Sequence, residues 1–315
     1  MSESKLAFVF PGQGSQKVGM LAELAGEYSL VKETFSDASD VLGYDLWELV
    51  QEGPQEQLNL TERTQPMLLA ASVATWRVWR SQSGMLPLRL AGHSLGEWSA
   101  LVAANVVDFA DAVSLVQQRG KLMQEAVPAG QGGMAAIIGL DDAAIIAACE
   151  QAAEGEVVAP VNFNSPGQVV IAGSSSAVER AMVLCKEAGA KRALALPVSA
   201  PFHTSLMQPA ADGLAPRIAE TQFRAPEIPV VHNVHAKTET DPEAIKRLMI
   251  EQIYSPVLWV SGVQALVESG VDTTVECGPG KVLSGLNKRI DKSLTTLSIE
   301  SPEDLRAALQ QTKGE

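Results

Sequence analysis

A serine in a glycine-flanked turn is the first residue of this chain whose setting points to chemistry. The segment Gly92-His93-Ser94-Leu95-Gly96 fits the pattern G-x-S-x-G, with an apolar strand predicted before it at 88–91 and a helix after it. In such an elbow the serine hydroxyl projects into a cleft, and the first turn of the helix directs backbone amides toward developing negative charge. Ser94 is therefore predicted to be a nucleophile; the alternative is a glycine-rich turn that arose by chance.

A nucleophilic serine needs a base, and histidine has the only side chain whose unperturbed pKa lies in the right range. The chain has four histidines. His93 adjoins the serine and is expected to point away from it, while His232 and His235 lie in a strand-like run and at its exit. His203 follows a strand end and two turn-forming residues, where the catalytic groups of α/β sheets gather. Elimination favours His203 as the base, although a lone histidine in a loop is often inert.

The glycine turn after the first strand does not match the known nucleotide-binding loops. Lys17 stands where the dinucleotide fingerprint needs glycine, and Met20 stands where a phosphate-binding loop needs lysine. The turn at Gly12-Gln13-Gly14 can still offer a backbone amide to an oxyanion. The sequence has no H-E-x-x-H motif and no His or Cys cluster at metal-ligand spacing, so no metal is expected.

The order of strands, turns and helices predicts the fold that positions these residues. Strand, glycine turn and helix follow one another from residue 5 and again from residue 88, which favours a parallel sheet covered by helices. Between residues 133 and 197 the order becomes strand, helix, strand, strand, helix, strand, which is the ferredoxin-like unit. A long helix is expected to follow Thr64, which would cap it, with Pro66 in its first turn. The predicted fold is α/β, with a large discontinuous domain, residues 1–130 and 199–315, and a small inserted domain, residues 131–198.

The overall composition narrows the class of function. The chain has 315 residues, of which 46% are hydrophobic and 19% charged, as in ordinary globular proteins. A formal net charge of -13 argues against nucleic acid as a partner, because neutralising phosphates takes a surplus of Lys and Arg. The apolar run at 6–10 is far too short for a signal-peptide core or a membrane span, so a cytoplasmic protein without membrane association is expected.

Seven short segments, in order over nearly the whole chain, form a combined pattern. They are Phe10–Gln16 (FPGQGSQ), Gln65–Pro66, Gly92–Glu97 (GHSLGE), Gln118–Gly120, Asn162–Pro166 (NFNSP), Ser199–His203 (SAPFH) and Glu276–Gly280 (ECGPG). Together they resemble the malonyl-CoA:acyl-carrier-protein transacylases of bacterial fatty-acid synthesis. The fold of that family, an α/β-hydrolase-like core with a ferredoxin-like insert, agrees with the predicted elements.

The resemblance implies roles for individual residues. Ser94 would be the nucleophile and His203 its base, oriented by the main-chain carbonyl of Gln252. Arg119 would hold the free carboxylate of the substrate, although without the resemblance a solvated helix face would be the better explanation. The other implied site residues are Gln13 and Leu95, whose backbone amides would bind the oxyanion, Asn162, which would line the cleft, and Phe202, which would shape the acyl pocket.

The implied reaction moves a malonyl group from malonyl-CoA to the phosphopantetheine thiol of acyl carrier protein through acyl-Ser94, in a monomer without a cofactor. Two alternatives stay open. A serine thioesterase or esterase would pass the acyl group to water, and a non-catalytic module would only dock the carrier protein. An arginine that binds a carboxylate favours malonyl transfer over hydrolysis of neutral acids. Trp98, His232 and Cys277 depart from what the family leads one to expect, and none is expected to touch the chemistry.

Overall fold

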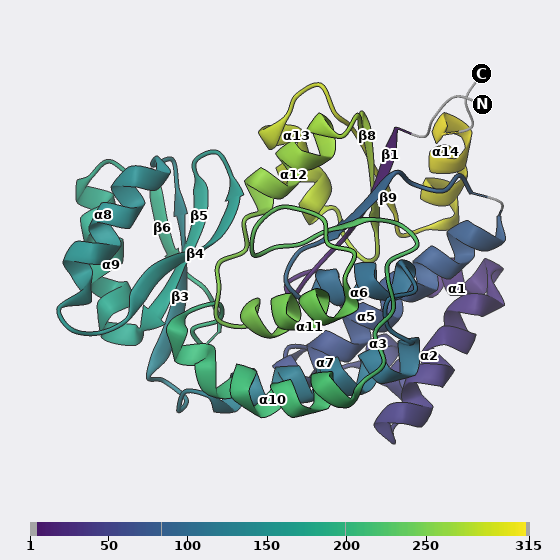
Figure 1. The fold of residues 1–315 in the computed structure, drawn as a ribbon, viewed down its shortest axis with the longest axis horizontal. Coiled ribbons are helices and arrows are strands. Elements are labelled where there is room, and N and C mark those ends of the chain that lie inside the picture. Colours follow the sequence, from purple (N-terminus) through teal and green to yellow (C-terminus); the bar gives the residue numbers. More distant parts are fainter. Residues whose placement is uncertain (1–4, 83, 199, 313–315) are drawn as a thin grey trace.

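Two β-sheets organise the chain in the computed structural model, which describes residues 5–82, 84–198 and 200–312 (Figure 1). The predicted limits of the large domain at residues 1, 199 and 315 lie outside the described residues. In the described part of the chain, the larger sheet has five strands in the order β7-β2-β1-β8-β9, and every neighbouring pair is parallel. These strands are β1 (Leu6–Phe10), β2 (Arg89–Gly92), β7 (Val230–Val231), β8 (Thr273–Cys277) and β9 (Thr295–Ile299).

Helices from both halves of the chain surround the larger sheet. Those that precede the smaller sheet in sequence are α1 (Ala22–Glu27), α2 (Ser29–Leu42), α3 (Leu46–Glu52), α4 (Gln55–Leu58), α5 (Thr61–Ser81), α6 (Leu95–Ala103) and α7 (Phe109–Glu125). Those that follow it are the 3₁₀ helix η1 (Ser205–Met207), α10 (Gln208–Glu220), α11 (Pro242–Glu251), α12 (Trp259–Glu268), α13 (Val282–Ile290) and α14 (Pro302–Thr312). None of the helices in the described residues combines the length and apolar character needed to cross a membrane.

The first strand shows why the larger sheet is buried on both faces. All five residues of β1 are buried, and their side chains alternate between two cores. Leu6, Phe8 and Phe10 belong to the core that contains α5, whereas Ala7 and Val9 pack with residues of α12 and α13. Because successive strand residues point to opposite faces, a continuous apolar run is what a strand between two helical layers requires.

The smaller sheet comes from the middle of the chain and lies at the left of Figure 1. Its strands follow the order β4-β5-β3-β6, and neighbouring pairs are antiparallel. The elements are β3 (Gly132–Ile138), α8 (Asp142–Ala153), β4 (Val158–Ser165), β5 (Gln168–Ser174), α9 (Ser175–Glu187) and β6 (Arg192–Ala195). The predicted fold class, a parallel α/β sheet with a ferredoxin-like insert, is confirmed. The domain limits at 130/131 and 198/199 stay a prediction.

The long helix α5 begins at Thr61, four residues before its predicted start, and Thr64 lies inside it, so the prediction that Thr64 caps the helix was wrong. Leu60 precedes the helix, and the Thr64 hydroxyl donates to the carbonyl oxygens of Leu58 (2.5 Å) and Leu60 (3.1 Å). A capping threonine would instead accept hydrogen bonds from the first backbone amides. Pro66 lies in the second turn of α5, inside the helix.

Candidate active site

Ser94 lies in a tight turn between β2 and α6. Its φ of 51° falls in the left-handed region, which residues other than glycine seldom adopt. A Cβ on Gly92 would overlap the backbone of Gly96, and a Cβ on Gly96 would overlap the carbonyl of Phe10, so both flanking positions require glycine. The Asn233 side chain holds the turn, because it accepts a hydrogen bond from Ser94 N (2.8 Å) and donates one to the Gly92 carbonyl (2.7 Å). The turn has the strained geometry of a nucleophile elbow.

The imidazole of His203 contacts the Ser94 hydroxyl. Ser94 Oγ and His203 Nε2 are 2.8 Å apart, and His203 Nδ1 is 2.8 Å from the main-chain oxygen of Gln252. Because a carbonyl oxygen can only accept, Nδ1 carries the proton and Nε2 accepts from the hydroxyl. Burial, together with the Arg119 guanidinium, lowers the pKa of His203 to about 3, so the imidazole is neutral at pH 7. Ser94 and His203 thus have the geometry of a nucleophile and its general base.

Arg119 is buried beside this pair and is only 1% exposed, so it does not lie on a solvated face of α7. Its Nη2 lies 3.3 Å from Ser94 Oγ and 2.9 Å from Gln252 Oε1, and its Nη1 donates to Gln65 Oε1 at 2.8 Å. Burial lowers the pKa of Arg119 to about 10 against the opposing effect of Glu97, so the guanidinium is charged at pH 7. Its Nε has no hydrogen-bond partner among the described residues. A buried cation with an unused donor is suited to a carboxylate ligand.

The pocket at Ser94 has a volume of about 130 Å³. Of the predicted site residues, its lining contains Gln13, Ser94, Leu95, Arg119, Asn162, Phe202 and His203. Gln252 is connected to it through hydrogen bonds to His203 and Arg119. The remaining lining residues are Gln65, His93, Met123, Met134, Leu196 and Val198. The predicted residues therefore converge on one pocket, while the role of each stays a prediction.

His93 and Asn162 complete the polar part of this pocket. His93 lines the pocket, and its Nε2 lies 2.7 Å from Asn164 Oδ1. The buried Oδ1 of Asn162 has no partner among the residues that the structure describes, so it can accept a hydrogen bond from a bound molecule. Within the same described part of the chain, no group of three or more His, Cys, Asp or Glu side chains could hold a metal ion.

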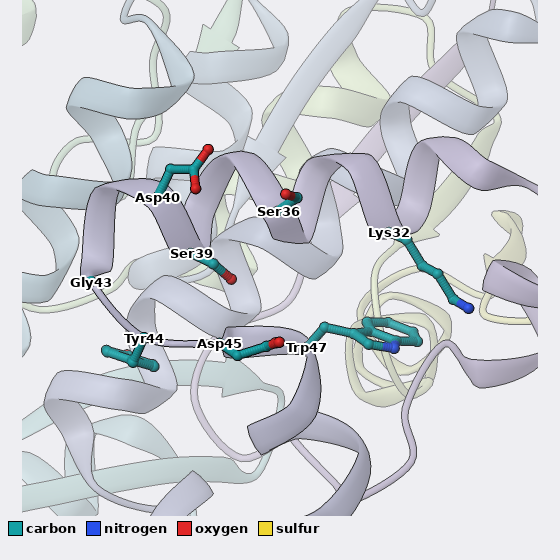
Figure 2. A pocket seen from close by; sticks show the side chains of 8 residues that line it. All are labelled: Lys32, Ser36, Ser39, Asp40, Gly43, Tyr44, Asp45 and Trp47. Atoms are coloured by element: carbon teal, nitrogen blue, oxygen red, sulfur yellow. The ribbon is translucent and has the colours of Figure 1, made fainter.

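A larger groove elsewhere on the molecule lacks the groups for this chemistry (Figure 2). It has a volume of about 620 Å³ and is lined by Lys32, Ser36, Ser39, Asp40, Gly43, Tyr44, Asp45 and Trp47. Its lining contains serines but no histidine. The Ser39 hydroxyl is already used, since it donates to the Phe35 carbonyl and accepts from Leu46 N. Volume alone therefore points to the wrong surface, and the hydrogen-bond geometry identifies the smaller pocket.

A buried polar network behind the pocket was not predicted from the sequence. Glu97, three residues after Ser94, is 1% exposed and accepts hydrogen bonds from Gln252 Nε2 (2.6 Å) and Asn233 N (3.2 Å). A carboxylate within an otherwise apolar helix is the signal that could have revealed it. His232 Nδ1 lies 2.7 Å from Glu97 Oε1. The parallel pairing of β7 with β2 brings the end of β7 beside the elbow, so His232 is connected to the pocket through Glu97 and Gln252. The expectation that His232 does not touch the chemistry stays a prediction.

Known proteins share this fold and sequence over nearly their whole length. The acyl transferase domain family matches residues 7–298. A malonyl CoA-acyl carrier protein transacylase of Salmonella typhimurium is 61% identical over 98% of this chain and 100% of its own length. The crystal structure of an acyl carrier protein S-malonyltransferase from Vibrio cholerae has a TM-score of 0.95 at 63% identity, over 96% of this chain and 99% of that chain. A malonyl-transacylase in complex with a type II PKS acyl-carrier protein has a TM-score of 0.97 at 56% identity, over 98% and 100%.

Proposed function

The chain belongs to the acyl transferase family, and from this we propose that it moves a malonyl group from malonyl-CoA to the phosphopantetheine thiol of acyl carrier protein. One observation carries the proposal: the Ser94 hydroxyl lies 2.8 Å from His203 and 3.3 Å from the buried guanidinium of Arg119. A serine with a base can transfer many acyl groups. A guanidinium at the same hydroxyl favours an acyl group that carries its own carboxylate.

In the first half-reaction, Ser94 Oγ attacks the thioester carbonyl while His203 Nε2 takes the hydroxyl proton. The Gln252 carbonyl, which accepts from His203 Nδ1, favours the imidazolium that forms. We assign the resulting oxyanion to the backbone amides of Gln13 and Leu95, both of which line the pocket. The carbon–sulfur bond then breaks, and the departing CoA sulfur takes the proton from His203.

Arg119 connects recognition of the acyl donor to the basicity of His203. Its positive charge is the second cause, after burial, of the low pKa of His203. A malonyl carboxylate bound to the guanidinium would neutralise this charge and so raise the pKa of the base at the moment of attack. An acetyl group has no carboxylate and would leave His203 as the weaker base.

The second half-reaction repeats this chemistry with a different nucleophile. The phosphopantetheine thiol attacks the malonyl-Ser94 ester, and His203 Nε2 takes the thiol proton. The bond between the acyl carbon and Ser94 Oγ breaks, and His203 returns the proton to Ser94 Oγ. Attack by water at this stage would waste the acyl group, so transfer requires that the thiol reach the ester in preference to water.

The test is intact mass spectrometry after mixing with malonyl-CoA. The wild type should gain one malonyl group and Ser94→Ala none. Ser36→Ala is the matched control, because Ser36 is exposed in the larger groove, whose lining contains no histidine, and this variant should be labelled like the wild type. Labelling of Ser94→Ala would overturn the assignment of the nucleophile.

The hydrolase alternative receives less support from the site. A thioesterase for neutral acids has no use for a guanidinium, whereas Arg119 is 1% exposed and lies within 3.3 Å of the nucleophile. The non-catalytic alternative is weakened by the intact contact of Ser94 with His203. We further propose that the protein acts as a cytoplasmic monomer in fatty-acid biosynthesis and needs no cofactor, because the reaction as written uses only groups of the chain, the CoA thioester and the carrier-protein thiol. Sedimentation analysis of the purified chain tests the monomer.

A further inference from the structure

The side chain of Gln252 connects the nucleophile, the base and the guanidinium. Its main-chain oxygen accepts from His203, and its side-chain Oε1 accepts from Arg119 Nη2 at 2.9 Å. Its Nε2 donates to the main-chain oxygen of Ser94 at 3.0 Å and to Glu97 Oε2 at 2.6 Å. Gln252 is 1% exposed, so its side chain has no contact with bulk water that could replace these bonds.

The direction of the Gln252 amide is fixed by the two charged groups beside it. A guanidinium can only donate hydrogen bonds and a carboxylate can only accept them. Turned by half a rotation, the amide would place its N–H groups against Arg119 and its oxygen against Glu97, and both contacts would be repulsive. Glu97 is itself held in place, because Oε1 lies 2.7 Å from His232 Nδ1 and Oε2 accepts from Asn233 N.

We propose that Glu97 is a positioning residue for donor selection: by binding Gln252 Nε2, it keeps Gln252 Oε1 on Arg119 and the guanidinium beside Ser94 Oγ. The inference rests on the proposed malonyl transfer and names a residue that acts without touching the substrate. Glu97 is on α6 and shares this helix with the elbow that holds Ser94. The nucleophile and the group that orients the guanidinium are therefore parts of one rigid element.

This arrangement predicts that loss of the carboxylate at position 97 lowers the rate of malonyl transfer more than the rate of acetyl transfer. Without the Glu97 carboxylate, Gln252 Nε2 loses its shortest contact (2.6 Å) and keeps the Ser94 main-chain oxygen (3.0 Å) and the more distant Asn233 Oδ1 (3.4 Å). The Gln252 amide is then held less firmly against Arg119, and the guanidinium can shift away from Ser94. Malonyl transfer depends on that guanidinium, whereas acetyl transfer does not. The main-chain oxygen of Gln252 stays on His203 in either orientation of the side chain, so the serine and its base are preserved.

Two variants separate the effect of losing the hydrogen-bond acceptor at position 97 from the effect of losing its negative charge. Glu97→Met removes the acceptor at similar side-chain length, and it should lower kcat/KM for malonyl-CoA about tenfold to a hundredfold, with less than about a threefold fall for acetyl-CoA. Glu97→Gln removes only the charge. Its oxygen can accept from Gln252, and its amide can donate to His232 Nδ1 if the imidazole proton moves to Nε2, which has no partner among the described residues. Glu97→Gln should therefore keep most of the malonyl preference.

Glu276→Met is the matched control for the loss of a buried carboxylate. Glu276 is fully buried, and its oxygens accept from the backbone amides of Leu283 and Ser284 at the start of α13. This variant should lose stability and leave the ratio of malonyl to acetyl acylation unchanged. Circular dichroism and thermal unfolding identify variants that fold. If Glu97→Met does not fold, Glu97→Asp is measured instead, since it withdraws the carboxylate by one methylene and should shift the ratio in the same direction.

The outcomes are distinguishable. The positioning role is supported if the malonyl-to-acetyl ratio falls in Glu97→Met and stays near the wild-type value in Glu97→Gln and in the Glu276→Met control. Equal losses with both donors, or a ratio unchanged from the wild type, would show that Glu97 only stabilises the fold. A wild type that malonyl-CoA does not label at Ser94 would instead overturn the proposed function itself.

Discussion

Arg119 is the side chain on which the choice of donor should depend most directly. Removing one partner of a buried charge pair costs on the order of 2 to 5 kcal/mol, which corresponds to a roughly thirtyfold to several-thousandfold fall in kcat/KM for malonyl-CoA. Arg119→Ala should show this fall and should gain, relative to malonyl-CoA, with acetyl-CoA. Arg119→Lys should keep part of the malonyl rate, because lysine supplies a point charge without the planar fork.

The measurement is kcat/KM for both donors in the wild type and in each variant. Lys121→Ala is the matched control, since Lys121 is a cation on the same helix with an exposed side chain, and its donor ratio should not change. If Arg119→Ala had the wild-type ratio, the guanidinium would have no part in recognising malonyl, and the main reason for preferring that donor would be lost.

The pH dependence of acylation is a second prediction at the scale of one residue. An unperturbed histidine titrates near about 6.5, but burial and the Arg119 charge lower the pKa of His203 to about 3. Since the depressed pKa keeps the base neutral above about pH 4, the acylation rate should change little between pH 5 and 8. Labelling by malonyl-CoA well below saturation measures it across this range, because such rates report the pKa of the base in the free enzyme. A rate that rises roughly tenfold per pH unit up to pH 6.5 would mean that the pKa is not depressed.

The elbow is the element whose geometry the site depends on most. A Cβ at position 92 or 96 would overlap main-chain atoms of the elbow or of β1, and displacing these atoms would cost free energy. Gly92→Ala and Gly96→Ala should each lose about 1 to 3 kcal/mol of unfolding free energy or more and most of the acylation rate. Gly26→Ala is the contrasting control: Gly26 lies in α1, and a Cβ at this position would have no neighbour within 4 Å, so alanine should stabilise the helix by up to about 1 kcal/mol. Urea unfolding and malonyl labelling test all three, and an active, stable Gly96→Ala would contradict this account of the elbow.

The elements that the sequence predicts well are those defined by local pattern. The apolar run of β1 and the glycine elbow are visible in consecutive residues, and so is the βαββαβ order of the smaller sheet. The start of α5 was misplaced because the Thr64 hydroxyl bonds backward to carbonyls, a choice that depends on the preceding loop. The partners of Glu97 could not be predicted for a different reason, although its place in a mostly apolar helix was a signal. The network joins side chains of α6, α7, the end of β7 and the end of α11, and no local pattern records which of them meet.

The acyl pocket belongs to the whole molecule, because both sheets contribute to it. Met134 on β3 and Asn162 on β4 line the same cavity as Ser94. Beside the pocket, β4 is joined to the chain that follows α11, since Phe163 N donates to the Val257 oxygen (3.1 Å) and Val257 N donates to the Val161 oxygen (2.7 Å). The base is oriented by the end of α11 itself, through Gln252. The segment between α11 and α12 therefore links the position of the smaller sheet to the orientation of His203.

Stability of the whole molecule should fall as the pH is lowered from 7 to 5. Burial lowers the pKa of His93 and brings that of His203 to about 3, so the folded chain resists protonation at both positions more than the unfolded chain does, and at pH 5 His203 is protonated only in the unfolded chain. Unfolding free energy rises with pH wherever the unfolded state binds more protons, and His203 alone accounts for about 2 kcal/mol between pH 5 and 7. Glu276 acts in the opposite direction, because burial raises its pKa. The informative measurement is therefore the difference between the wild type and His203→Gln in urea unfolding at pH 7, 6 and 5. The variant should lose about 2 kcal/mol less than the wild type over this range, whereas parallel curves for the two proteins would mean that His203 titrates normally in the folded state.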